Sequence, residues 1–223
     1  MSGFYTSYIK FKLRAWLKYG WIVPSLLFSA LTWAHPHSWI SVKTQLLSQD
    51  QKITAIKMDW EFDAMTSAYT LDGEDTSPEH LEQTLQNLAN ESIQNMLAEH
   101  YFTYFYQGDN PIRYFEAENA RYTLKQGKLT LSFELPLEKP QPVQGQSLKL
   151  LVFEPSYYID MTWKSEDDIK LSGDLAKACQ VEIIEPTPTP EQMSYAMSLP
   201  ADADPDNALG QLFTQTAEFH CQD

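Results

Sequence analysis

A two-residue alternation of apolar and polar side chains between Trp39 and Asp63 constrains the fold more than any other feature of this chain. The first segment would place four residues on one side of an extended strand: Ile40, Val42, Thr44 and Leu46. After turn-forming residues at 48–51, the second segment has a matching apolar set: Ile56, Met58, Trp60 and Phe62. Its other side carries Lys57, Asp59, Glu61 and Asp63. A period of two over this length predicts a half-buried antiparallel hairpin with a charged outer face.

The rest of the chain predicts a single α+β domain dominated by antiparallel sheet, with one long helix and a short C-terminal helix. Pro78 and Glu79 suit a first helical turn, and leucines at helical spacing continue that helix to about His100. Further strands are expected at 101–106, 121–124, 129–135, 148–153, 157–163, 179–185 and near Cys221. A stiff Pro-rich spacer at 186–190 precedes the short helix expected at 207–214.

Residues 1–34 have the pattern of a cleavable secretory signal. Four basic residues lie between positions 10 and 18, and no acidic residue precedes position 35. The uncharged run 21–33 follows, and Ala34 after it provides a small-residue cleavage site. The run is shorter than the roughly 20 apolar residues that span a bilayer, so cleavage is favoured over an uncleaved anchor. We therefore expect a signal peptide at 1–34 and an exported mature domain at 35–223, beginning with His35.

Charge and cysteine content narrow the class of protein further. The whole chain has 16 basic and 30 acidic residues, and four of the basic ones belong to the signal. So acidic a mature chain argues against nucleic acid as a partner, because phosphates require a basic surface. Cys179 and Cys221, an even number in an exported chain, predict one disulfide bond.

The mature N-terminus, His35-Pro36-His37, is the candidate metal-binding segment. Imidazole is a common ligand for zinc, copper and nickel. A planar amino-terminal copper/nickel chelate is excluded, because Pro36 has no backbone N–H to deprotonate. Two histidines are fewer than a closed site requires, so carboxylates must come from elsewhere. Asp63 is the first candidate because its strand is expected to lie beside the one after His37, and Glu154 and Asp160 are in reserve.

Three motifs together carry a family resemblance: His35-Pro36-His37-Ser38-Trp39-Ile40, Trp60-Glu61-Phe62-Asp63 and Glu154-Pro155-Ser156-Tyr157-Tyr158-Ile159. With the cysteine pair that follows, the mature chain resembles an uncharacterised family of bacterial periplasmic proteins. Its members are commonly encoded beside, or fused to, inner-membrane permeases of the nickel/cobalt type, and a ZevA-like subgroup is linked to zinc acquisition. The resemblance implies a periplasmic accessory protein that binds zinc or nickel/cobalt, works with an inner-membrane metal permease and meets the membrane only through that partner. The implied ligands are His35 and His37, then Asp63, with Glu154 and Asp160 last.

Two other classes of function remain open from the sequence. One is a copper enzyme with an N-terminal histidine brace, in which His35 supplies amine and ring and His100 is a conceivable second arm. The other is a non-metal adaptor that docks on a permease. The chain has no nucleophile elbow, phosphate-binding glycine loop or His-Glu-x-x-His motif, so we do not predict an enzyme.

Overall fold

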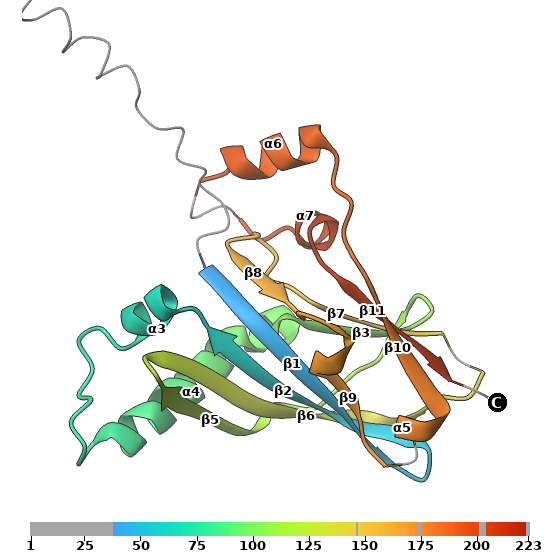
Figure 1. The fold of residues 1–223 in the computed structure, drawn as a ribbon, viewed down its shortest axis with the longest axis horizontal. Helices are drawn as coiled ribbons and strands as arrows, with labels where there is room; N and C mark the ends of the chain where they lie inside the picture. Colours follow the sequence, from blue (N-terminus) through green and yellow to red (C-terminus); the bar gives the residue numbers. More distant parts are fainter. Residues whose placement is uncertain (1–37, 146, 174, 201–203, 222–223) are drawn as a thin grey trace, which may run out of the picture. The chain divides into compact units, whose positions relative to one another are not determined.

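The hairpin expected from the alternation forms the centre of the larger of two sheets (Figure 1). The computed structural model describes residues 38–221 except 146, 174 and 201–203. Strand β1 (Ser38–Gln49) pairs antiparallel with β2 (Lys52–Phe62), with Val42 opposite Trp60. The apolar side of the hairpin is buried and the charged side faces outward, as predicted.

The first sheet extends on both sides of this hairpin. Its strand order is β5-β6-β2-β1-β8, with β5 at Glu118–Lys125, β6 at Lys128–Pro142 and β8 at Ile159–Thr162. Strand β9 (Ile169–Leu171) also pairs with β1, and both β8 and β9 run parallel to it. The sheet is therefore mixed at this edge, whereas its other pairings are antiparallel.

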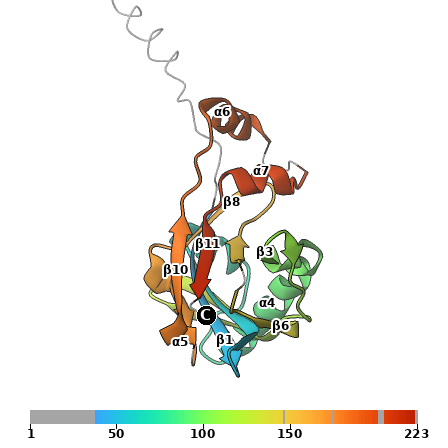
Figure 2. The same ribbon diagram turned by 90° about the vertical axis from the view of Figure 1, so that its right-hand side faces the viewer.

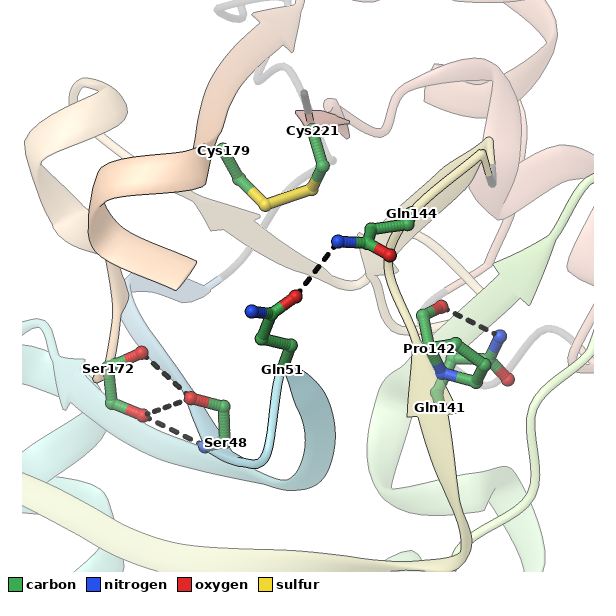
Figure 3. The surroundings of a disulfide bond; sticks show 8 residues. All are labelled: Ser48, Gln51, Gln141, Pro142, Gln144, Ser172, Cys179 and Cys221. Atoms are coloured by element: carbon green, nitrogen blue, oxygen red, sulfur yellow. Dashed lines mark hydrogen bonds between the residues drawn. A yellow bond between two sulfur atoms is a disulfide. The ribbon is translucent and has the colours of Figure 1, made fainter. Parts of the chain in front are cut away.

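The second sheet has the order β10-β11-β7-β3-β4. Its strands are β10 (Cys179–Ile184), β11 (Thr216–Cys221), β7 (Leu148–Val152), β3 (Thr103–Gln107) and β4 (Asn110–Pro111). Figure 2 shows β10 and β11 side by side, and their first and last residues, Cys179 and Cys221, are direct cross-strand partners. These cysteines form the predicted disulfide (Figure 3).

Seven helical segments complete the described chain. They are α3 (Ala64–Thr70), α4 (Leu81–Met96), η1 (Leu97–Phe102), η2 (Glu166–Asp168), α5 (Leu175–Ala178), α6 (Pro190–Ser198) and α7 (Asn207–Leu212). Helix α4 is the predicted long helix, although it begins at Leu81 because residues 77–80 form a turn. The predicted short C-terminal helix is α7. Within the described residues, no helix is both long and apolar enough to cross a membrane.

One buried cluster joins the two sheets and α4. Leu131 and Phe133 of the first sheet belong to the same cluster as Leu150 and Phe219 of the second, and Ile93 adds the helix. The described residues belong to one compact unit, Ala34–Asp223. The predicted α+β fold class, dominated by antiparallel sheet, is thus confirmed.

Three local predictions were wrong. Asp63 does not continue the charged face of β2, because the strand ends at Phe62 and Asp63 is the N-cap of α3. The strand expected at 129–135 is longer than predicted, since β6 continues to Pro142. The spacer at 186–190 ends in a helix that we did not predict, and Thr189 and Gln192 form a capping box at the start of α6.

Candidate functional site

The candidate site lies where the chain enters the first sheet. His35 and His37, like the predicted signal at 1–34, lie outside the described residues. Ser38 is the first described residue, and its side chain is buried. Trp39 follows with its side chain half exposed on the outer face of β1. Ser38 and Trp39 directly follow the histidine pair in sequence, so the side chains around these two residues are the candidates for further ligands.

Asp63 anchors the first two residues of β1. Its Oδ2 accepts a hydrogen bond from the Trp39 N–H at 3.0 Å and another from the Thr66 hydroxyl. Its Oδ1 accepts from the N–H groups of Met65 and Thr66 at 2.8 and 2.9 Å. The Thr66 hydroxyl in turn lies 2.8 Å from that of Ser38. A carboxylate has about four acceptor positions, so those of Asp63 are fully used within the fold.

This hydrogen bonding also sets the charge state of Asp63. Burial raises the pKa of its carboxyl group, but the hydrogen bonds from Thr66, Trp39 and Met65 outweigh burial and hold the pKa below its ordinary value. Asp63 is therefore a charged helix cap that fixes the start of β1. Asp is a favoured N-cap residue, so the sequence allowed this role, but the strand alternation also included Asp63.

Asp160 is the second carboxylate beside Trp39. In the parallel pairing of β1 with β8, Trp39 is opposite Asp160, and the next pair, Ile40 and Met161, is buried. Trp39 and Asp160 therefore share the outer face of the sheet. The Asp160 carboxylate is partly buried, and among the described residues it has no hydrogen-bond or ion-pair partner. Burial without a compensating partner raises its pKa.

Glu154 has a structural role in the loop before β8. One oxygen of its carboxylate accepts from the Ser156 N–H at 2.9 Å. The other accepts from the Ser156 hydroxyl and the Tyr158 N–H, both at 2.8 Å. Glu154 thus closes the turn that leads into the strand carrying Asp160.

The described histidines do not form an alternative centre. His80 lies 2.9 Å from Asp75 on an exposed turn, and His220 lies 3.4 Å from Glu182 on the outer face of β10 and β11. His100 lies within η1, the helical segment after α4. Between residues 38 and 221, leaving out the gaps noted above, no group of three His, Cys, Asp or Glu side chains could hold a metal ion.

The structure thus brings two of the five sequence-predicted site residues together at Trp39. Asp63 contacts its backbone and Asp160 is its cross-strand neighbour. The two carboxylates differ, since Asp63 is fully hydrogen-bonded and Asp160 is free among the described residues. Of the carboxylates proposed from the sequence, Asp160 therefore has the most oxygen lone pairs free to bind a metal ion.

Comparison with known proteins relates the chain to one family and to one uncharacterised protein. Residues 21–221 match the family described as "Protein of unknown function (DUF1007)". The chain is also similar to an uncharacterised protein of Haemophilus influenzae, with 29% identity over 192 residues. That alignment covers 85% of this chain and 92% of the relative.

Proposed function

The chain belongs to the DUF1007 family, and we propose that it is an exported accessory protein that binds a transition metal next to the start of β1 and passes it to a membrane permease. His35 and His37 supply imidazole nitrogens and Asp160 supplies a carboxylate oxygen. Asp63 serves as the anchor that positions this end of β1.

The free carboxylate of Asp160 is the observation that carries this proposal. Taking an ionised carboxylate partly out of water without a partner is unfavourable, and a bound cation compensates for it. Asp160 is opposite Trp39, and His37 precedes Trp39 by two residues in sequence. A chain spans at most about 3.3–3.6 Å per residue, so His37 and His35 lie at most about 7 and 14 Å from Trp39, and we infer from these short separations that both can act as ligands beside this carboxylate.

The donor set limits which metals suit the site. Imidazole nitrogens with one carboxylate oxygen match zinc, and imidazole also suits nickel and cobalt. Three protein ligands leave an exchangeable coordination position, which favours capture and release over permanent structural binding. The disulfide between Cys179 and Cys221 is in keeping with an exported protein, because such bonds persist in oxidising compartments. A periplasmic location would place the protein next to an inner-membrane permease as its partner.

Calorimetry on the mature chain, beginning at His35, tests the proposal. Zn²⁺, Ni²⁺ and Co²⁺ are titrated into the native sequence, into a His35→Ala/His37→Ala variant and into Asp160→Asn. We expect the double variant to lose tight binding, and Asp160→Asn to weaken it by about tenfold or more.

A His80→Ala/His220→Ala variant is the matched control, because it removes two exposed imidazoles from other parts of the fold. It should bind as tightly as the native chain. Equal affinities for the two double-histidine variants would refute the site. Absence of metal binding by the native chain would favour the adaptor alternative. An adaptor of that kind would bind the permease equally well with and without metal.

A further inference from the structure

A left-handed turn of three non-glycine residues precedes β3. His100, Tyr101 and Phe102 have φ angles of 51°, 54° and 51°. Residues with a Cβ rarely adopt this region, and a consecutive run is costly because each residue contributes its own strain. Such backbone persists only where the surroundings over-determine it, and it concentrates at binding sites.

The carbonyl groups of this turn all have donors. The Tyr114 hydroxyl lies 2.7 Å from the His100 carbonyl oxygen and also contacts that of Thr103. The Thr103 hydroxyl donates to the Tyr101 carbonyl at 2.9 Å. The Phe153 N–H donates to the Phe102 carbonyl at 2.9 Å. These bonds hold the turn in its strained form and keep His100 at one position on the surface.

His100 lies at the edge of a hollow of about 310 Å³ beside β3. It is lined by three tyrosines and two charged residues: Tyr104, Tyr106, Tyr114, Arg113 and Glu138. The ring of His100 meets that of Tyr104 edge to face, with centroids 6.2 Å apart. The volume is at the lower end of the range for small-molecule sites.

Arg113 and Glu138 give the hollow one charge of each sign. Their backbones are joined, since the Glu138 N–H donates to the Arg113 carbonyl at 3.0 Å. Their side chains nevertheless form no ion pair with each other or with any other described residue. Two opposite charges that line one hollow and remain unpaired are complementary to a ligand that carries both charges itself.

We propose that this hollow binds a small zwitterion, an α-amino acid with an aromatic or other flat apolar side chain. Arg113 pairs with the carboxylate in a forked geometry, Glu138 pairs with the ammonium group, and the tyrosines contact the side chain. His100 donates or accepts a hydrogen bond at the polar end. Burial raises the pKa of Tyr104 and Tyr114, so their hydroxyl groups stay protonated and do not repel the carboxylate. The site is independent of the proposed metal site, and either can fail without the other.

Three probes separate the two charges. L-phenylalanine carries both, hydrocinnamate lacks the ammonium group, and phenethylamine lacks the carboxylate. Binding to the mature chain is measured by calorimetry, with ligand-observed NMR for weak cases. We expect L-phenylalanine to bind at least about tenfold more tightly than either single-charge probe, because each of those probes loses one charge-assisted hydrogen bond. Equal affinity for the three probes, or binding by none of them at millimolar concentration, would overturn the proposal.

Charge-neutralising variants assign the two ends. Arg113→Gln should weaken L-phenylalanine and hydrocinnamate but not phenethylamine, and Glu138→Gln should show the reverse selectivity. Glu116→Gln and Lys139→Gln are matched controls, because both residues are exposed neighbours outside the hollow. Loss of binding that does not follow the charge of the probe would contradict the assignment.

His100→Gly separates ligand binding from folding. Glycine adopts a φ of 51° without strain, so the melting temperature should stay the same or rise. Removing the ring should still weaken L-phenylalanine binding severalfold. A variant that binds L-phenylalanine as tightly as the native chain would show that the His100 ring has no part in the site.

Discussion

Asp63 and Trp39 are joined in both directions: the Trp39 N–H donates to the Asp63 carboxylate, and the Asp63 N–H donates to the Trp39 carbonyl, each at 3.0 Å. The same carboxylate caps α3 through Met65 and Thr66. One side chain therefore couples the first residues of β1 to the helix that follows β2. Because β1 begins directly after His37, this coupling determines where the candidate metal-binding segment emerges from the fold.

Asp63→Asn should lower the free energy of unfolding by about 1–2 kcal/mol at pH 7, since an amide keeps only one of the two acceptor oxygens. The folded-state pKa of Asp63 is lowered. Its stabilisation is therefore present above the unfolded pKa of about 3.9 and is lost as pH falls through the folded pKa. Urea unfolding at pH 7 and pH 2.5 should show a difference between native and variant chains that shrinks in acid. Asp50→Asn, in the hairpin turn, is the control and should leave the free energy of unfolding unchanged at both pH values.

Asp160→Asn should have the opposite effect on stability. Burial raises the folded-state pKa of Asp160, so its charged form opposes folding above that pKa, and the cost disappears below the unfolded pKa of about 3.9. The metal-free variant should be more stable than the native chain by about 0.5–1 kcal/mol at pH 7, with no gain at pH 3. Urea unfolding in the presence of a chelator measures both. A less stable variant at pH 7 would mean that the carboxylate has a structural partner.

Much of the sheet could be predicted because its strands alternate with a period of two. The inward residues of β1, β2 and β6 follow from the sequence, as in Trp60 and Phe133, whose rings meet edge to face in the core. The parallel pairing of β1 with β8 and β9 could not be predicted, because partners more than 100 residues apart leave no local pattern. Helix α3 has seven residues and one buried side chain, Ser67, so it has no apolar stripe to find.

The candidate site was predictable only in outline. Asp63 was chosen for its place on the charged face of the second strand, with Glu154 and Asp160 in reserve, and sequence spacing does not distinguish a free carboxylate from one used in a turn. Their hydrogen bonds make that distinction, because Asp63 and Glu154 close local turns and Asp160 does not. The left-handed turn at His100 had no sequence signal, since glycine or asparagine normally marks such a conformation.

Gly210→Ala should detach α7 from the loop that carries Glu154. A Cβ at this position would lie 2.5 Å from Cδ2 of Phe153 and 3.2 Å from Cα of Pro155. Since backbone atoms cannot move aside cheaply, we expect a loss of about 1–3 kcal/mol in the free energy of unfolding. Gln211→Ala, exposed on the same helix, is the control and should be close to neutral. A neutral Gly210→Ala would indicate that α7 is loosely packed in solution.

Replacing Cys179 and Cys221 together by serine should cost about 2–4 kcal/mol, because the bond closes a 42-residue separation in the unfolded chain. The loss should concentrate at β10 and β11, whose ends the bond joins. Thermal unfolding with and without reductant measures it. Reductant should lower the melting temperature of the native chain and leave the serine variant unchanged. Two free thiols in the denatured, unreduced native protein would contradict the bond.

Metal affinity should decrease as pH falls from 7.5 to 5.5 if imidazoles hold the ion. A histidine must be neutral to ligate, and its ordinary pKa is about 6.5, so each competing proton costs up to about tenfold at pH 5.5 and the pair up to about 100-fold. Competition with a zinc-sensitive dye at both pH values measures the change in the mature chain. The His80→Ala/His220→Ala control should show the same dependence, because its exposed histidines contribute nothing to the site. An affinity that stays constant across this range would instead assign the ion to carboxylates alone and remove His35 and His37 from it.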